Sequence, residues 1–428
     1  MTVTILLFFV LIVIGAPIVF ALGVSATLSL VLLDIPIGII AQRMYGGLDS
    51  FTVMAIPFFV FAGIIMEQGG IARRIIEFSV ALVGWITGSL LLVATIAGIG
   101  MAAVSGSGAA STAAISSIML KEMRQRGYDI DFSSGLMAAA GTLGPVIPPS
   151  IMMVVLATTA NVSVGRAFLG GILPGLMMAA GIMLACYLFA RRGGSAYADT
   201  EPFSLVRLWR TFAAALPAFV LPLIIVGGII SGAFTPTEAA AVAVLCGLVI
   251  SLLVYREFGV RDIPGMILRA ASVSASIMMI IATASIFSWL IAVENAPAAI
   301  AGAMHQATEN PLVFLLFVNI LLILIGMIME GISAILVMVP VLMPIALSYG
   351  IDPLHFGVVV IINLSIGMIT PPYGITLYVA SSVAGRTVVQ VSRKIGMPLL
   401  LMLLVLVLTT LFPSLVTLIP DFFMGTAS

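Results

Sequence analysis

The sequence GTLGPVIPPS at residues 141–150 interrupts a long apolar segment, and GMITPPYGIT at residues 367–376 does the same in the second half of the chain. Proline lacks a backbone N–H group and collides with the preceding helical turn, so each sequence is expected to break its helix. When the second half of the sequence is aligned with the first at one constant offset in residue number, without gaps, the two double prolines coincide. This repeat shift aligns Gly108 with Gly331, Gly127 with Gly350, Asp129 with Asp352, Gly144 with Gly367, and Pro148-Pro149 with Pro371-Pro372. The chain therefore repeats one unit that contains a broken helix.

The composition places this unit in a membrane. Hydrophobic residues make up 62% of the 428 residues and charged residues only 8%, whereas soluble domains carry about 25% charged residues. Since helices satisfy their own backbone polar groups, the long apolar runs predict an all-α polytopic membrane protein. In such proteins, interrupted helices at matching places in two halves point to a binding site. The net charge of zero says little about partners, but the lack of a basic patch argues against nucleic acid as a partner.

The apolar runs define two kinds of segment. Segments 88–126 and 311–349 each have room for two short helices, with small or polar residues between them. We expect re-entrant hairpins there, because irregular backbone inside a bilayer must be buried in protein or line a wet cavity. Segments 68–87 and 294–310 are expected to be amphipathic helices along the membrane surface. The expected spanning helices are 3–33, 50–67, 133–158, 168–190, 212–231, 238–254, 264–293, 355–384 and 395–418.

The basic residues predict an orientation. With a cytoplasmic N-terminus and the C-terminus on the opposite side, 15 of the 17 Lys and Arg residues fall on the cytoplasmic side. Only Arg43 and Arg166 fall on the opposite side of the membrane. Counting either hairpin as a single span would invert everything after it and remove this asymmetry. The hairpins then enter from opposite sides, so the repeats 3–190 and 238–418 are expected to have inverted topology.

The first polar cluster is Ser105-Gly106-Ser107-Gly108, which is followed by Ser111 and Thr112. At a hairpin tip, free carbonyl groups and hydroxyls can replace the water around a small cation. The next helix would point the positive end of its dipole at an anion. Close helix packing through small residues explains the cluster equally well. The break at 141–150 favours a function more strongly, because a simple kink needs one proline and this sequence has three.

The second repeat offers Glu330-Gly331-Ile332-Ser333, with hydroxyls from Thr370 and Thr376. Glu330 aligns with Ser107, so the two tips differ chemically. Glu330 is either a protonated, hydrogen-bonded structural residue or a cation ligand, and the sequence leaves both interpretations open. Asn363 is a polar residue within an apolar helix and is therefore a candidate site residue.

Two other polar motifs have structural explanations. Asn319 is expected to make a hydrogen bond between helices. The sequence Thr235-Pro236-Thr237-Glu238 predicts a helix start with a capping box, because Thr is the N-cap, Pro is the first helical residue and Glu is the third. The chain contains no nucleophile–base pair, phosphate-binding loop or zinc-ligand spacing, so we do not expect an enzyme.

These motifs, in this order along essentially the whole chain, resemble the large membrane subunit of tripartite ATP-independent periplasmic (TRAP) transporters. The resemblance rests on Ser105–Thr112, Gly141–Ser150, Phe234–Ala239 and Thr370–Gly374. It implies a sodium-driven importer of an organic acid, such as a sialic acid or a C4-dicarboxylate, in a bacterial inner membrane. The implied partners are a small four-helix membrane subunit, a soluble periplasmic binding protein and membrane lipid. The implied coupling ion is Na⁺, without an organic cofactor.

The resemblance also implies site residues, and these fall into three groups. The first sodium site would use Ser105, Ser107, Gly108, Gly141, Thr142 and Gly144. The second would use Gly331, Ser333, Gly367, Thr370 and Gly374. The substrate would lie near Ser105, Ser107, Pro149, Ser150, Glu330, Pro372 and Tyr373. No Lys or Arg lies at either tip or break, so a substrate carboxylate would be held by helix N-termini, hydroxyls and bound sodium.

The implied fold is an inverted-repeat elevator with four parts. Residues 1–87 would form scaffold helices and a surface arm helix, and residues 191–310 would form further scaffold helices and a second arm. Residues 88–190 would form the first half of the transport domain, with hairpin 88–126, broken helix 133–158 and helix 168–190. Residues 311–428 would form the second half, with hairpin 311–349, broken helix 355–384 and helix 395–418.

Three alternatives differ in mechanism. A stand-alone sodium–dicarboxylate symporter with related hairpins would need neither partner subunit. An ion channel would need an open path lined by rings of carbonyl groups or charges, whereas an inverted repeat favours alternating access. An intramembrane enzyme would need converging acid–base or nucleophilic groups, which the sequence lacks.

Overall fold

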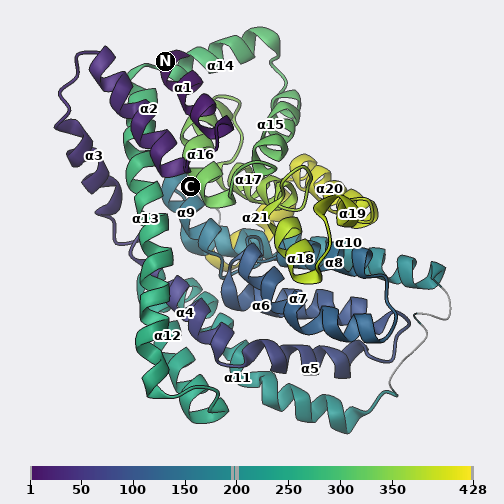
Figure 1. The fold of residues 1–428 in the computed structure, drawn as a ribbon. Helices are drawn as coiled ribbons and strands as arrows, with labels where there is room; N and C mark the ends of the chain where they lie inside the picture. Colours follow the sequence, from purple (N-terminus) through teal and green to yellow (C-terminus); the bar gives the residue numbers. More distant parts are fainter. Residues whose placement is uncertain (1, 194–196, 198–201, 426–428) are drawn as a thin grey trace.

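The computed structural model describes residues 2–193, 197 and 202–425, which form helices joined by short turns (Figure 1). The first half contains α1 (Thr2–Val13), α2 (Ile18–Leu32), α3 (Ile39–Leu48), α4 (Ala55–Gln68), α5 (Ile71–Val83), α6 (Ser89–Ser105), α7 (Gly108–Gln125), α8 (Ile130–Gly141), α9 (Ile151–Ala160) and α10 (Val164–Arg192). The second half begins with α11 (Leu205–Ile230), α12 (Pro236–Val249), the π-helical turn η2 (Ile250–Tyr255), the short η3 (Val260–Asp262), α13 (Ile263–Val293) and α14 (Ala296–Ala307). It ends with α15 (Pro311–Gly326), α16 (Gly331–Ser348), α17 (Pro353–Gly367), α18 (Ile375–Ala384), α19 (Val388–Ser392), α20 (Gly396–Leu411) and α21 (Ser414–Met424).

The apolar helices confirm the prediction of an all-α polytopic membrane protein. Within the described ranges, five helical segments are long and apolar enough to cross a bilayer: 164–192, 205–230, 236–255, 260–293 and 331–348. Two further pairs, α4 with α5 and α20 with α21, qualify when each bent pair counts as one span. The 63° bend between α4 and α5 turns α5 away from the direction of α4.

The predicted breaks are present in both repeats. Residues 106–107 separate α6 from α7, and residues 142–150 separate α8 from α9. The repeat shift that aligns the double prolines also places α7 on α16, and residues 368–374 separate α17 from α18. Both double prolines contain a cis peptide bond, between Pro148 and Pro149 and between Pro371 and Pro372.

Matching carboxylates begin the two broken helices. The side chain of Asp129 accepts hydrogen bonds from the N–H groups of Asp131 and Phe132 at the start of α8. The side chain of Asp352 accepts one from His355 at the start of α17. Each carboxylate satisfies backbone donors that have no partner within the helix. The predicted capping box of Thr235 and Glu238 is also confirmed at the start of α12.

Each hairpin is closed at its base by aromatic residues. At the first, the backbone carbonyl of Tyr197 accepts a hydrogen bond from Gly88, and its hydroxyl accepts one from the N–H of Asp129. At the second, the ring of Phe314 near the start of α15 stacks on Tyr349 just beyond α16, with centroids 4.8 Å apart. The two helices of each pair are therefore antiparallel, with their tips at 106–107 and 327–330.

The prediction of one spanning helix at 3–33 is wrong. Residues 14–17 separate α1 from α2, and the hydroxyls of Thr4 and Ser29 lie 2.6 Å apart. The chain therefore turns back on itself, because Gly15, with φ of 91°, and Pro17 interrupt the helix. Both ends of this segment therefore lie on the same side of the membrane. The prediction of a cytoplasmic N-terminus assumed that this segment crosses the membrane once, and that assumption no longer holds.

The prediction of one straight helix at 395–418 also needs correction. Helix α20 ends at Leu411, and α21 leaves it at an angle of 62°. Pro413 removes a backbone donor at this position and explains the bend. Arg166 pairs with Asp421 and donates to the carbonyl of Gly425, so the end of α21 lies beside the start of α10.

Helices α3 and α4 run antiparallel to the long α13 (Figure 1). The guanidinium of Arg43 in α3 lies 4.8 Å from the ring centroid of Trp289 near the end of α13. Arg269 near the start of α13 lies 3.6 Å from Glu67 at the end of α4. At the repeat shift, α13 is the uninterrupted counterpart of α3 and α4, which residues 49–54 separate.

These contacts predict which connections share a side of the membrane. Single cysteines at Asp34 and Glu309 should react with an impermeant maleimide from one side, and a cysteine at Arg261 should react only from the other. Each would be made with Cys246→Ser, which removes the partly exposed native thiol, and measured in sealed vesicles of both orientations. Labelling of positions 34 and 309 from opposite sides would contradict the folded-back arrangement of α1 and α2.

Candidate functional site

A glycine and three serines order the first hairpin tip. Gly106 has φ of 60°, which favours glycine, and it lets the chain reverse between α6 and α7. The hydroxyls of Ser105 and Ser111 lie 2.7 Å apart. The N–H of Ser107 donates to the Ser105 hydroxyl at 3.3 Å. The tip is therefore ordered by its own polar groups.

The first break packs directly against this tip. A Cβ atom on Gly144 would lie 3.0 Å from the carbonyl carbon of Ser107, and one on Gly106 would lie 2.8 Å from the Pro149 oxygen. A Cβ atom on Gly141 would overlap the Thr112 hydroxyl and lie 2.9 Å from the Gly108 oxygen. Side chains at these glycines would thus separate the two segments. The structure brings together the predicted residues Ser105, Ser107, Gly108, Gly141 and Gly144, whereas the Thr142 hydroxyl donates to Ala139 within its own turn.

The second hairpin tip is ordered by a carboxylate. Glu330 is the N-cap of α16, and its Oε2 accepts hydrogen bonds from the N–H groups of Ile332 and Ser333 at 3.0 and 3.3 Å. The positive end of the helix dipole favours an acidic group at this position. Buried Ser333 has no hydrogen-bond partner for its hydroxyl.

The second break approaches this hairpin through residues before the tip. A Cβ atom on Gly367 would lie 2.6 Å from both Cα and the carbonyl carbon of Gly326. The N–H of Gly374 donates to the carbonyl of Met327 at 3.3 Å. The hydroxyls of Thr370 and Thr376 donate to carbonyls of their own segment. Of the predicted second set, Gly367 and Gly374 therefore contact the hairpin before its tip, whereas Gly331, at the start of α16, faces Met152 and not this break.

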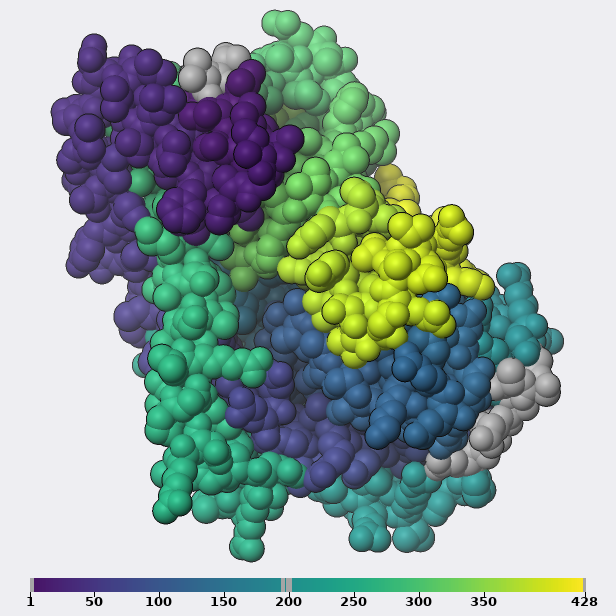
Figure 2. Space-filling model, viewed as in Figure 1, coloured from purple at the N-terminus to yellow at the C-terminus, as the bar shows by residue number. Residues whose placement is uncertain are grey.

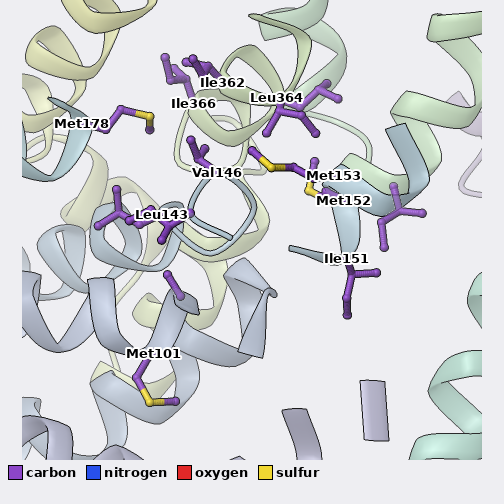
Figure 3. Packing of buried hydrophobic residues seen from close by; sticks show 14 of the residues in the cluster. Met101, Leu143, Val146, Ile151, Met152, Met153, Met178, Ile362, Leu364 and Ile366 are labelled. Carbon is purple, nitrogen blue, oxygen red and sulfur yellow. The ribbon is translucent and has the colours of Figure 1, made fainter. Parts of the chain in front are cut away.

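Each tip also contacts the break of the other repeat. A Cβ atom on Gly108 would lie 2.8 Å from Met368 Cε and 3.3 Å from Thr376 Cγ2. A Cβ atom on Gly331 would overlap Met152 Cε at the start of α9. Figure 3 shows Met152 and Met153 below Leu364 of α17, with Val146 of the first break to their left. The two tips and two breaks therefore form one packed unit.

A cavity of about 490 Å³ opens beside this unit. In Figure 2 the surface is hollowed between α13 and the helices of the first hairpin. The tips and breaks contribute Ser105, Ser107, Glu330, Ile151, Met152, Met368 and Ile375 to its lining. The outer wall consists of α4 and α13, including Glu67, Arg269 and Ser276.

The predicted substrate residues fall into two groups, those that line the cavity and those that do not. Ser105, Ser107 and Glu330 line it. Pro149 lies behind Gly106, and buried Ser150 caps α9 while donating to the carbonyl of Pro145. Pro372 is exposed, and the exposed ring of Tyr373 stacks on Tyr378, so neither belongs to the lining.

The charged pair in the cavity wall, Arg269 with Glu67, was not predicted from the sequence. Arg269 and Glu67 lie in opposite halves of the sequence, in helices that were assigned to the scaffold alone. The available signal was two charged residues near the ends of apolar helices, which the positive-inside rule explains equally well. Only the packing of α4 against α13 brings them into the cavity.

A second cavity of about 390 Å³ lies farther along α13, between α3, α9 and α16. Gly46 and Gly47 contribute to it from α3. Its lining contains the hydroxyl residues Ser50, Thr158, Thr159, Ser285 and Ser288. At the repeat shift, Gly46 corresponds to Arg269, so the two cavities use equivalent parts of the repeat with different chemistry.

The polar residues Asn319 and Asn363 form a bridge outside this cavity. Asn363 donates to Asn319 at 2.8 Å, and Asn319 donates to the Thr410 hydroxyl at 3.0 Å. This confirms the predicted interhelical hydrogen bond of Asn319. It joins α15, α17 and α20 behind the second break, and so Asn363 has a structural partner.

The family of the chain follows from its sequence match over almost its whole length. Residues 5–415 match the family described as the DctM component of the tripartite ATP-independent periplasmic transporter. The chain belongs to this family. Its described helices thus belong to a multi-pass TRAP transporter permease.

Three TRAP relatives have similar sequences. The chain is 39% identical to the isethionate TRAP transporter permease protein DctMQ of Oleidesulfovibrio alaskensis, over 98% of this chain and 65% of that protein. It is 38% identical to the C4-dicarboxylate TRAP transporter large permease protein DctM of Rhodobacter capsulatus, over 95% of this chain and 96% of that one. It is 37% identical to the sialic acid TRAP transporter large permease protein SiaM of Vibrio cholerae, over 96% of both.

A solved structure shares the fold. The YdaH transporter of Alcanivorax borkumensis, described as having an unusual topology, superposes with a TM-score of 0.57 at 15% identity. The match covers 85% of this chain and 86% of that one. At this identity the likeness extends to the fold alone.

The glycine contact between the second hairpin and break predicts a stability effect. Gly367→Ala should destabilise the protein by about 1–3 kcal/mol, because its Cβ would press on the backbone of Gly326, which cannot rotate away. Gly396→Ala is the matched control, since a Cβ there meets nothing within 4 Å. Thermal unfolding in detergent measures the difference, and equal midpoints for both variants would contradict the prediction.

Proposed function

We propose that this chain is the large permease subunit of a sodium-driven importer for an anionic organic acid. The observation that carries the proposal is the cavity whose lining joins both hairpin tips with the second break and with the start of α9, which follows the first break. Ser105 and Glu330 are far apart in the sequence, and both line this cavity. A solute in this space contacts both hairpin tips and the second break, so its binding and the packing of the tips are coupled.

The charges of the cavity support an anion that binds together with a cation. Its lining contains two carboxylates, Glu67 and Glu330, and one guanidinium, Arg269, among the described residues. An incoming acid group would add a further negative charge in a medium that screens charge less than water. A bound cation offsets this repulsion. The relatives named for isethionate, C4-dicarboxylates and sialic acid support an acid as the solute.

The tips and breaks offer oxygen ligands for sodium. For the first site we propose Ser105, Ser107 and Gly108 with Gly141, Thr142 and Gly144. For the second we propose Gly331 and Ser333 with Gly367, Thr370 and Gly374. The unpartnered hydroxyl of buried Ser333 supports this assignment, since a buried polar atom without a partner costs free energy that a cation would recover. Carbonyl groups freed at the breaks supply the remaining oxygens.

Alternating access of the elevator type fits the two cavities along α13. One lies at Arg269 and Ile277, and the other lies at Ile281 and Ser288. Movement of the unit of tips and breaks along this wall would open the site to each side in turn. We place the starts of α5 and α13 in the cytoplasm from the basic residues there. The end of α21, which lies beside Arg166, and the folded-back helices α1 and α2 are then periplasmic.

We assign the partners from the family. A small four-helix membrane subunit and a soluble periplasmic binding protein would complete the transporter in the inner membrane. A stand-alone sodium symporter, which would need neither partner, is the second candidate. Copurification with a small membrane subunit distinguishes the two.

The deciding experiment is uptake into proteoliposomes that contain this chain and its small subunit. Labelled succinate, isethionate and sialic acid would be offered with and without an inward sodium gradient, and with and without the binding protein. Uptake that requires both sodium and the binding protein is expected. Uptake that ignores the binding protein would favour the stand-alone symporter, and sodium-independent uptake would contradict the proposed coupling.

Removing one proposed sodium ligand predicts a graded effect. Ser333→Ala should raise the sodium concentration for half-maximal uptake about three- to tenfold, which corresponds to the loss of one modest polar contact. Ser231→Ala is the control, because that hydroxyl is exposed at the end of α11. An unchanged sodium dependence in Ser333→Ala would remove this residue from the site.

A further inference from the structure

Arg269 is the one guanidinium among the described residues that line the large cavity. It lies in the second turn of α13, and its side chain is 54% exposed, against 31% for Glu67. Both side chains lie in the cavity wall, opposite the first hairpin tip with Ser105 and Ser107. Its charge is therefore open to a solute in the cavity.

The long contact with Glu67 leaves the guanidinium of Arg269 free to bind a solute. The N–O distance is 3.6 Å, whereas charge-assisted hydrogen bonds of arginine are about 2.7–2.9 Å long. By comparison, Arg73 and Arg74 lie 2.6 and 2.9 Å from Glu257, and Arg74 also stacks on Tyr255. Those arginines are fixed between α5 and η2. Arg269 has a nearby counter-charge and unused donors.

The repeat shows that the fold does not require these charges. At the repeat shift, Gly46 occupies the position of Arg269 and Leu290 that of Glu67. Gly46 lines the second cavity, so the equivalent wall packs without a guanidinium. A charge pair present in only one of two matching walls serves something other than the shared framework.

We propose that Arg269 is the anion subsite of the cavity and binds the acid group of the solute, a carboxylate or a sulfonate. This inference rests on the proposed function, because it identifies where that solute is held. The planar guanidinium offers parallel N–H donors that match two oxygens of an acid group. Glu67 keeps the guanidinium oriented when the cavity is empty of solute. Since an exposed ion pair stabilises little, the solute exchanges for Glu67 at low cost.

This assignment changes the expectation that hydroxyls, helix N-termini and sodium alone hold the acid group. The tips and breaks contain no Lys or Arg, but the opposite wall supplies one. The acid group would point toward α13, and the rest of the solute would face Ser105, Ser107 and Glu330. Solutes of different length with one terminal acid group would share this anchor.

The test is equilibrium binding of labelled succinate, isethionate and sialic acid to the purified membrane complex in sodium. Each acid is compared with its neutral amide or ester as a competitor. Arg269→Gln should raise the dissociation constant of the bound acid about tenfold or more, and it should remove most of the preference for the acid over its neutral analogue. Arg269→Lys should restore part of both, because it keeps the charge without the fork.

Two controls separate the possible outcomes. Arg261→Gln removes an exposed arginine in η3, the short helix that precedes α13. This variant should leave the dissociation constant within about twofold of that of the unchanged complex. Glu67→Gln should preserve or strengthen acid binding, because it frees the guanidinium. An Arg269→Gln complex that keeps the affinity and the acid preference would overturn this inference alone. If the unchanged complex binds none of the three acids, the proposed function itself fails, and the subsite fails with it.

Discussion

The fold depends on one constraint: a backbone N–H or C=O group inside a bilayer needs a partner within the protein. Four segments of this chain break their helices, and each is covered by another of the four. Gly144 lies on the backbone of Ser107, Gly106 on Pro149, and Gly367 on Gly326. Glycine is needed at these contacts because backbone meets backbone there. The breaks that form the candidate site are therefore also places where backbone packs closely on backbone.

The two repeats share this packing and differ in chemistry. Serine orders the first tip, and a glutamate that caps α16 orders the second. The walls differ as well, since one cavity holds Arg269 with Glu67 and the other holds hydroxyls around Gly46. The repeated framework therefore holds two cavities with different side chains along α13.

Much of the architecture was readable from the sequence. Prolines mark the breaks at 142–150 and 368–374, and the gapless repeat shift identifies matching helices. Apolar content and helix length predict a membrane protein, and the family match over residues 5–415 agrees with the resemblance carried by the motifs. The sequence was misleading at 3–33 and 395–418, where apolar runs have the length of single spans. Gly15, Pro17 and Pro413 break them, but hydropathy does not register a turn between equally apolar helices.

The candidate site divides in the same way. The sequence by itself determined which segments unwind and which polar residues they contain, because proline and glycine act on the local backbone. Only the tertiary structure decided that Ser105, Ser107 and Glu330 line the cavity while Ser150 and Tyr373 do not. It also decided that Arg269 and Glu67 meet, since their approach depends on the packing of α4 against α13. Local rules fix where a helix ends, but the neighbours of a side chain depend on contacts between residues far apart in the chain.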